Sequence, residues 1–175
     1  SIGSGDNMMS AIGAGAIKPG QVVASLGTSG TLFGVSENPV TLPDSDLAPF
    51  RDATGNHLPL YCLQNCSSAI EEVHQSTQRS LEELTTEATD LAPTSGPLFL
   101  PYLTGERSPD WPHASGVLFE IRPGQLQPAA MFRAAMEGVS YGLYRGAQQM
   151  HQAGLKITDL RVVGGGAQNP LWCQI

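Results

Sequence analysis

Twice in this chain a short, largely apolar run ends in a cluster of glycines, and this pattern limits the fold more than any other feature. Residues 22–26 lead into Gly27-Thr28-Ser29-Gly30, and residues 160–163 lead into Gly164-Gly165-Gly166. Runs of this length are typical of buried strands, and glycine lets the backbone turn sharply afterwards. A further apolar run, residues 31–35, follows the first turn at once. Two strands joined by so short a connection predict a β-hairpin.

The remaining segments alternate between helical and extended patterns. Apolar residues at helical spacing, or small residues in close succession, predict three complete helices, over residues 7–17, 67–84 and 128–151. Asn7 could cap the first of these, and Asn169 followed by Pro170 is a start signal for a fourth helix. A third strand is expected over residues 58–63, and residues 36–57 and 104–115 are expected to be loops. The layout is that of a mixed α/β domain.

Composition excludes several classes of protein. The 175 residues are 41% hydrophobic and 14% charged, which is too apolar for a disordered chain. Nine basic residues against 16 acidic ones give a net charge of −7, so a broadly basic face for nucleic acid is not expected. No apolar run approaches the roughly 20 residues of a membrane span. Three cysteines are an odd number, and their spacing predicts reduced thiols rather than disulfides or zinc.

The two ends of the chain indicate a piece of a longer protein. The chain opens without a methionine, in a segment typical of a loop after a strand, and it stops soon after Pro170. A helix that begins there and ends at residue 175 would have no partner against which to pack its apolar side. We therefore expect a fragment that is truncated at both ends.

The glycine-rich segments are candidates for binding an anion, because their backbone N–H groups can approach it closely. The turn at residues 27–30 adds two hydroxyls suited to phosphate, and Gly164 to Gly166 with Asn169 leaves room for a flat ring. A plain hairpin turn and a plain strand-to-helix turn are the alternatives. The common nucleotide motifs do not match, because no lysine follows either turn and Met8 stands where Gly-x-Gly-x-x-Gly needs its last glycine.

Two further segments carry side chains that could do chemistry. Asp6, between Gly5 and Asn7, could be a general base, a magnesium ligand or a helix cap. Glu106-Arg107, in a loop flanked by prolines, could be a ligand clamp or a surface ion pair. The histidines have no metal-ligand spacing, so we expect no metal site built by the protein alone.

Taken in order, these segments resemble the FGGY family of carbohydrate kinases over essentially all 175 residues. Gly3-Ser4-Gly5-Asp6-Asn7 is similar to the catalytic-aspartate segment of that family, and residues 25–30 are similar to its second phosphate loop. Residues 100–109 resemble a stretch found in xylulose kinases. Residues 133–138 resemble the core of the C-terminal signature helix, and residues 161–172 resemble the adenosine-binding strand, turn and helix. The first residues and the Pro-Asp-Trp-Pro loop are most similar to eukaryotic, plant-type members.

The resemblance implies an actin-like, ribonuclease H-like α/β domain, in which a mixed sheet opens with a hairpin and is flanked by helices. Residues 1–175 would be most of the C-terminal domain, one of the two domains of a sugar kinase, with the N-terminal domain absent. The implied reaction moves the γ-phosphoryl group of ATP, with Mg²⁺, to D-xylulose. The implied partners are the sugar and MgATP, with neither nucleic acid nor membrane. A cytoplasmic location is expected, and a homodimer is one option for assembly.

The resemblance also assigns roles to single residues. Asp6 would accept the proton of the attacking hydroxyl and would contact the sugar together with Asn7. ATP would be bound by Gly27, Thr28, Ser29, Gly165, Gly166 and Asn169. Three positions depart from the family pattern: Ala130 replaces a polar residue, Glu120 replaces a glycine, and the helix at residues 69–72 lacks a tryptophan to stack on adenine.

Three alternatives stay open. Another kinase of the same family could act on ribulose, gluconate, glycerol or a deoxy-sugar, because sugar choice is implied to lie largely on the absent domain. An actin-like ATPase would share the fold type. The fragment alone could also be inactive and bind nucleotide only weakly. Faster ATP consumption in the presence of sugar would distinguish a kinase from an ATPase.

Overall fold

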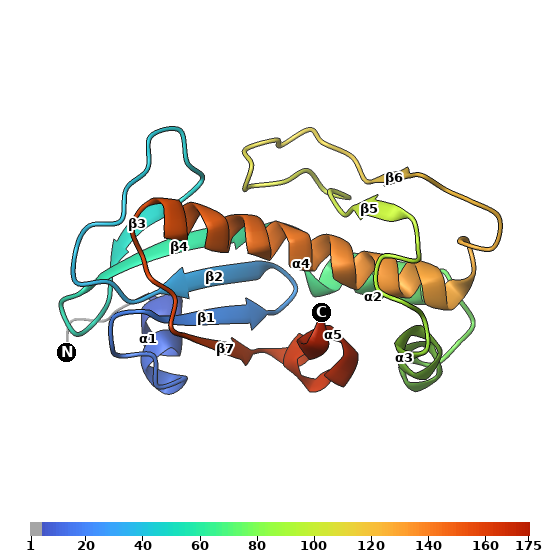
Figure 1. Cartoon of the computed structure of the whole chain (residues 1–175), viewed down its shortest axis with the longest axis horizontal. Helices are drawn as coiled ribbons and strands as arrows, with labels where there is room; N and C mark the ends of the chain where they lie inside the picture. The colour runs from blue at the N-terminus through green and yellow to red at the C-terminus, as the bar shows by residue number, and fades with distance from the viewer. Residues whose placement is uncertain (1–4) are drawn as a thin grey trace.

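The computed structural model describes residues 5–175 and is built on a five-stranded mixed sheet (Figure 1). The strands lie in the order β3-β4-β2-β1-β7, with bounds β1 Gln21–Leu26, β2 Gly30–Gly34, β3 Ala48–Arg51, β4 His57–Leu63 and β7 Asp159–Val163. A separate two-stranded sheet pairs β5 (Leu98–Leu100) with β6 (Val117–Phe119). The helices are α1 Asp6–Gly13, α2 Ser67–Gln75, α3 Leu81–Thr89, α4 Pro128–Gln152 and α5 Pro170–Gln174.

The predicted hairpin is confirmed, and it forms the centre of the sheet. β1 and β2 are antiparallel, with Val23 opposite Phe33, and β7 runs parallel to β1 on its other side. The side chains of a strand alternate between the two faces of a sheet. Val22 and Ala24 therefore join the core under α4, whereas Val23 joins a smaller core with Met8 of α1. α1 covers one face of the sheet, and α4 covers the other.

The 25-residue helix α4 is the main support of its face of the sheet. Glycines allow its close contacts: a Cβ added at Gly146 would stand 2.6 Å from the ring of Tyr61, and one at Gly138 would stand 2.2 Å from the carbonyl oxygen of Phe99. These contacts bring α4 against β4 and against β5. Within residues 5–175, α4 and the other helices lack the combination of length and apolar character that a membrane crossing requires.

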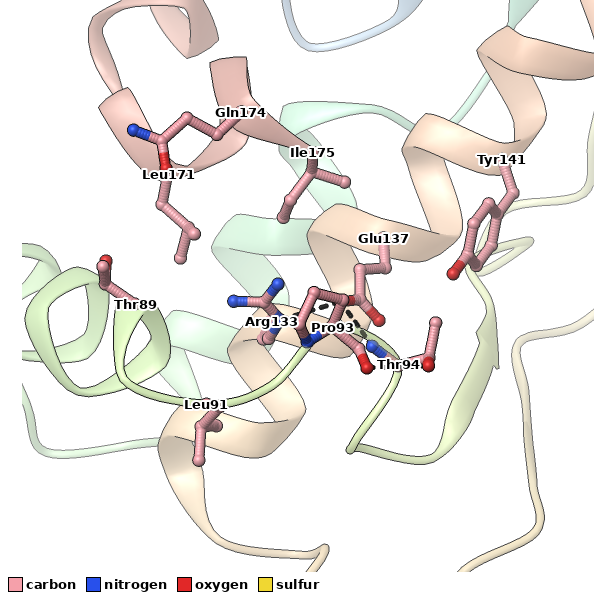
Figure 2. A pocket seen from close by; sticks show the side chains of 10 residues that line it. All are labelled: Thr89, Leu91, Pro93, Thr94, Arg133, Glu137, Tyr141, Leu171, Gln174 and Ile175. Carbon is pink, nitrogen blue, oxygen red and sulfur yellow. Dashed lines mark hydrogen bonds and ion pairs between the residues drawn. The ribbon is translucent and has the colours of Figure 1, made fainter.

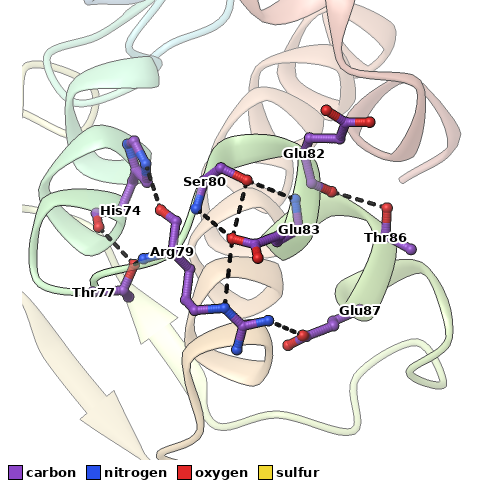
Figure 3. Close-up of polar contacts among 8 residues, drawn as sticks. All are labelled: His74, Thr77, Arg79, Ser80, Glu82, Glu83, Thr86 and Glu87. Carbon is purple, nitrogen blue, oxygen red and sulfur yellow. Dashed lines mark hydrogen bonds and ion pairs between the residues drawn. The ribbon is translucent and has the colours of Figure 1, made fainter.

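The predicted helix over residues 67–84 is wrong, because the segment forms two helices, α2 and α3 (Figure 3). α2 ends near His74, whose carbonyl oxygen accepts a hydrogen bond from Thr77 Oγ1 at 2.8 Å. α3 begins at a capping box, in which the Ser80 side chain accepts from the N–H of Glu83 and the Glu83 carboxylate accepts from the N–H of Ser80. Two orphan N–H groups are satisfied in this way, so a new helix start is favoured over continuation.

Other differences from the sequence predictions lie at short elements. β3 and β6 fall in or after segments predicted to be irregular, and α1 begins one residue earlier and ends sooner than predicted. The cap of α1 is Gly5 rather than Asn7. The start signal at the end of the chain is confirmed: the Asn169 side chain accepts a hydrogen bond from the N–H of Trp172, and α5 follows it.

Glu120, which stands where the resemblance expects a glycine, has a φ of +55°. This is the left-handed region that glycine occupies without steric cost and that other residues adopt only rarely. The local backbone has therefore kept the conformation of the glycine pattern although the residue differs. A second departure, Ala130, is buried at the start of α4.

Candidate functional site

The turn after β1 presents two hydroxyls and free backbone donors to solvent. Thr28 and Ser29 are exposed, and within residues 5–175 their N–H groups donate to no backbone acceptor. The carbonyls of the turn point the opposite way, into α2: Gly27 O accepts from the N–H of Ser67 at 2.9 Å, and Thr28 O accepts from Ser68 Oγ at 3.0 Å. The turn is therefore fixed to the start of α2 while its donors remain available to an anion.

Cys66 packs directly beneath this turn. Its Cβ and Sγ lie 3.2 Å from the position that a Cβ on Gly30 would take, so only glycine fits there without displacement. Burial raises the pKa of the Cys66 thiol to about 12. The three cysteines are free thiols, as predicted, although they differ in exposure: Cys66 is buried, Cys62 half-buried and Cys173 exposed.

The glycines after β7 bring a second loop to the same edge of the sheet. Gly164 has a φ of +91°, and a Cβ there would stand 2.7 Å from Leu26 O. A Cβ on Gly166 would likewise stand 2.7 Å from the Leu26 Cβ. Gly165, in contrast, has no atom within 4 Å of the corresponding position, so the space above it is open. This opening leaves space for a flat ring to approach the backbone, which stays a prediction.

Asn169 is held by the protein at both ends of its amide. Its Oδ1 caps α5 by accepting from the N–H of Trp172 at 3.1 Å, and its Nδ2 donates to Thr85 Oγ1 of α3 at 3.0 Å. These contacts show Asn169 as the cap of α5. Its ligand-binding role stays a prediction. Fixing Asn169 in this way also fixes the loop that contains Gly165 and Gly166.

Asp6 stands at the start of α1, exposed to solvent. Its Oδ1 accepts from the N–H of Asn7 at 2.8 Å, and the Asn7 Oδ1 accepts from Thr31 Oγ1 at 3.4 Å. Thr31 directly follows the turn at residues 27–30, so the structure brings the Asp6 segment to the turn. Gly3 and Ser4 of this segment lie outside the described residues.

Glu106 and Arg107 do not form the surface ion pair that was one of their two predicted interpretations. The Glu106 carboxylate is buried, at 3% exposure, and accepts hydrogen bonds from the backbone N–H groups of Gln64 and Arg107 and from Asn65 Nδ2. The Arg107 guanidinium lies on the outside of the same loop. Glu106 therefore anchors the loop to the end of β4. Its carboxylate does not pair with the Arg107 guanidinium.

A buried ion pair in α4 was not identified from the sequence (Figure 2). Arg133 Nε donates to Glu137 Oε1 at 2.7 Å, and both side chains are less than a tenth exposed. Arg133 also donates to Ala88 O at the end of α3, and Glu137 also accepts from the N–H of Thr94. The pair lines a cavity of about 360 Å³ and holds α3 in place. An Arg and a Glu four residues apart within the otherwise apolar residues 129–139 of α4 were the available signal.

No cluster of three or more metal-ligating side chains occurs within residues 5–175. Mg²⁺ in nucleotide-dependent enzymes is commonly held by one or two carboxylates together with substrate phosphates. A single exposed carboxylate, Asp6, beside a phosphate-sized turn is compatible with that mode of binding and incompatible with a closed protein cage.

Comparison with known proteins establishes the class first. The chain has the actin-like, ribonuclease H-like α/β fold of the FGGY sugar kinases, because it aligns with the crystal structure of xylulose kinase from Bifidobacterium adolescentis at a TM-score of 0.87 and 31% identity. That alignment covers 97% of this chain and 34% of the other. The chain belongs to the FGGY family of carbohydrate kinases: the model of its C-terminal domain matches residues 22–175.

Two individual relatives show which kinds of sugar kinase the chain is similar to. The xylulose kinase of Haemophilus influenzae is 35% identical over all of this chain and 36% of its own length. The gluconokinase of Bacillus subtilis is 30% identical over 99% of this chain and 37% of its own length. The chain therefore spans about a third of the length of these relatives. These relatives come from bacteria and do not test the expectation of a eukaryotic, plant-type member. That expectation stays a prediction.

Proposed function

We propose that the protein containing this chain transfers the γ-phosphoryl group of MgATP to a hydroxyl of D-xylulose, giving D-xylulose 5-phosphate and ADP. The observation that carries the proposal is the placement of Asp6 next to the turn at residues 27–30, through the contact of Asn7 with Thr31. The xylulose kinase relatives support the choice of sugar. We place the reaction in the cytoplasm, and a homodimer is one option for assembly.

In this mechanism the sugar hydroxyl oxygen forms a bond to the γ-phosphorus while the bond from that phosphorus to the bridging oxygen breaks. ADP leaves with the electron pair, and the hydroxyl proton passes to the Asp6 carboxylate. A positioned general base contributes roughly 10²–10⁴-fold to the rate.

The remaining expected roles follow the two glycine-rich loops. The N–H groups and hydroxyls of Thr28 and Ser29, with the backbone of Gly27, would bind the phosphates. Adenosine would lie over Gly165, where the structure has open space, with Gly166 and Asn169 beside it. Mg²⁺, held through the phosphates of ATP, would neutralise phosphate charge during transfer, and Asp6 would take the proton. Asn7 would orient the sugar.

A second candidate substrate is D-gluconate, because a gluconokinase is also among the relatives that match almost the whole chain. The two candidates share the nucleotide loops and Asp6, so they differ only in the sugar. An actin-like ATPase is the candidate from another class. It would hydrolyse ATP at a rate that no sugar changes.

The experiment that tests the proposal is ADP release by the full-length protein with MgATP and a panel of ketopentoses, polyols and aldonates. We expect D-xylulose to give the highest kcat/KM. A preference for D-gluconate would keep the assigned loops and replace the sugar. Equal ADP release with and without every sugar would reject the kinase and favour the ATPase.

A further inference from the structure

The guanidinium of Arg107 is a cation held in place by neutral groups. One terminal nitrogen donates to Gln64 Oε1 at 3.0 Å, and the other lies 3.4 Å from Cys62 Sγ. Within residues 5–175 no carboxylate forms an ion pair with Arg107, whereas Arg133, Arg145 and Arg161 each have one. Because no carboxylate in the described part of the chain pairs with it, this guanidinium is available to an anion from outside the chain. It can bind such an anion through two parallel hydrogen bonds.

The loop that carries Arg107 is built rigidly, so the cation has a defined position. Besides the buried Glu106 carboxylate, Asn65 donates to Gly105 O at 2.6 Å and accepts from the N–H of Thr104 at 3.3 Å. Tyr61 Oη donates to Ser108 O at 2.8 Å. These bonds join both sides of the loop to β4 and its end. The chain therefore needs little further ordering when Arg107 binds a ligand. The entropy cost of such ordering, which lowers affinity, is small.

Arg107 lies on the same face of the sheet as Asp6. Cys62, which it contacts, packs against the core beneath α1 and is the cross-strand partner of Thr31. Directly opposite partners in antiparallel strands have Cβ atoms about 5 Å apart on one face. Thr31 in turn contacts Asn7, the residue after Asp6. Cys62 and Thr31 are therefore the pair of neighbouring side chains that links the Arg107 guanidinium to the segment of Asp6.

The surroundings of Arg107 leave room for a ligand group. A hollow of about 200 Å³ is lined by six residues: Gln64, Thr104, Glu106, Arg107, Asp110 and Pro112. Of the two carboxylates in this lining, Glu106 is buried and Asp110 is exposed, and neither forms an ion pair with Arg107. The turn at residues 27–30 has no lysine, and the site would otherwise lack a side-chain cation from this chain near the transferred group.

We propose that Arg107 binds the phosphoryl group on its acceptor side: the group in transit, and then the phosphate of the sugar-phosphate product. This inference rests on the proposed function and adds a charged contact to it. Arg107 forms no covalent bond and moves no proton. Its guanidinium stabilises charge on the equatorial phosphoryl oxygens, which is the usual role of an arginine at such a centre.

The test compares the full-length wild type with Arg107→Gln, Arg107→Lys and the control Arg122→Gln, an exposed arginine on the loop before α4. We expect Arg107→Gln to lower kcat on the order of 10²-fold, because preorganised charge stabilisation of this kind is worth about that much. It should also weaken binding of D-xylulose 5-phosphate at least tenfold while leaving binding of D-xylulose unchanged. Arg107→Lys keeps the charge and loses the fork, so it should restore part of both.

A purely structural role for Arg107 would give a different pattern, namely a lower midpoint of thermal unfolding and equal losses for sugar and sugar phosphate. That pattern, or equal behaviour of Arg107→Gln and Arg122→Gln, overturns the inference. A wild type without sugar-dependent turnover rejects the proposed function instead. Arg107 is then judged by the binding of inorganic phosphate: a tenfold loss in Arg107→Gln supports an anion site, and no loss overturns it.

Discussion

At the scale of single residues, replacing Asp6 with asparagine separates proton transfer from the other roles of the site. Asparagine can keep the helix-start contacts of Asp6 but cannot accept a proton. We expect Asp6→Asn in the full-length protein to lower kcat by at least about 10²-fold with near-normal ATP affinity. Steady-state kinetics and nucleotide titration measure the two effects, with Glu37→Gln as a matched exposed control. Near-wild-type turnover would remove Asp6 from the mechanism.

Thr28 tests the assignment of the phosphate turn. Its side chain is exposed, so Thr28→Ala removes a hydroxyl without creating a cavity. A hydrogen bond to a charged group is worth about 1.5–3 kcal/mol, so we expect MgATP affinity to fall roughly tenfold or more. The KM for sugar should change little. Thr86→Ala, which removes a hydroxyl bonded within α3, is the control. A loss confined to sugar affinity would show that the turn is misassigned.

Cys66 provides a prediction that depends on pH. Its raised pKa of about 12 favours the neutral thiol, so the folded form is stabilised below the ordinary thiol pKa near 8.5, and this stabilisation is lost as the pH rises toward 12. The thiolate is the reactive form. We expect iodoacetamide to leave Cys66 unmodified at pH 7–9 in the native full-length protein and to modify it in urea, as followed by peptide mass spectrometry. Equal labelling in both states would contradict the packing beneath Gly30.

At the scale of elements, the Arg133–Glu137 pair joins α4, α3 and the segment before β5 (Figure 2). Removing one partner of a buried pair leaves an uncompensated charge and costs about 3–5 kcal/mol. We expect Arg133→Met to lower the unfolding free energy by that amount, and the double change Arg133→Met with Glu137→Met to recover most of it. Urea denaturation measures both.

The exposed pair of Arg79 with Glu87 is the matched control for this prediction (Figure 3). Surface pairs are screened by water and salt, so Arg79→Met should change stability little. If Arg79→Met and Arg133→Met had equal effects, the buried pair would have no special role. A double variant as unstable as Arg133→Met alone would show that packing, rather than unpaired charge, sets the cost.

The elements also show what the sequence could reveal. β1, β2 and α4 were predictable because their apolar spacing is local. The break between α2 and α3 was visible as Ser80-x-x-Glu83, but apolar spacing on both sides concealed it. β3 and β6 were not predictable from their own residues, because short strands depend on partners: β3 pairs with β4, and β6 pairs with β5. The burial of Glu106 likewise depends on Gln64 and Asn65, distant in sequence.

At the scale of the whole molecule, the site is assembled from segments that lie far apart in the chain. The turn after β1 and the loop after β7 lie side by side because β1 and β7 are parallel neighbours, and α1, which begins at Asp6, covers one face of the same sheet. The glycines and polar residues of these segments predicted ligand binding, and the resemblance assigned a role to each segment. Only the arrangement of the sheet shows how the segments are placed relative to one another. Arg107 reaches this face through contacts that no local pattern records.

The 175-residue chain by itself should bind nucleotide weakly. It spans about a third of the length of the relatives that it matches, so a nucleotide bound here would have only the contacts that these residues supply. Lost contacts reduce affinity exponentially, since each 1.4 kcal/mol is a factor of ten. We expect the isolated chain, once circular dichroism shows it folded, to bind MgATP at least about tenfold more weakly than the full-length protein and to show no stimulation by D-xylulose. Sugar-stimulated ADP release equal to that of the full-length protein would mean that these residues contain the whole catalytic site, and the sugar contacts would then have to be sought around Asn7 and Arg107.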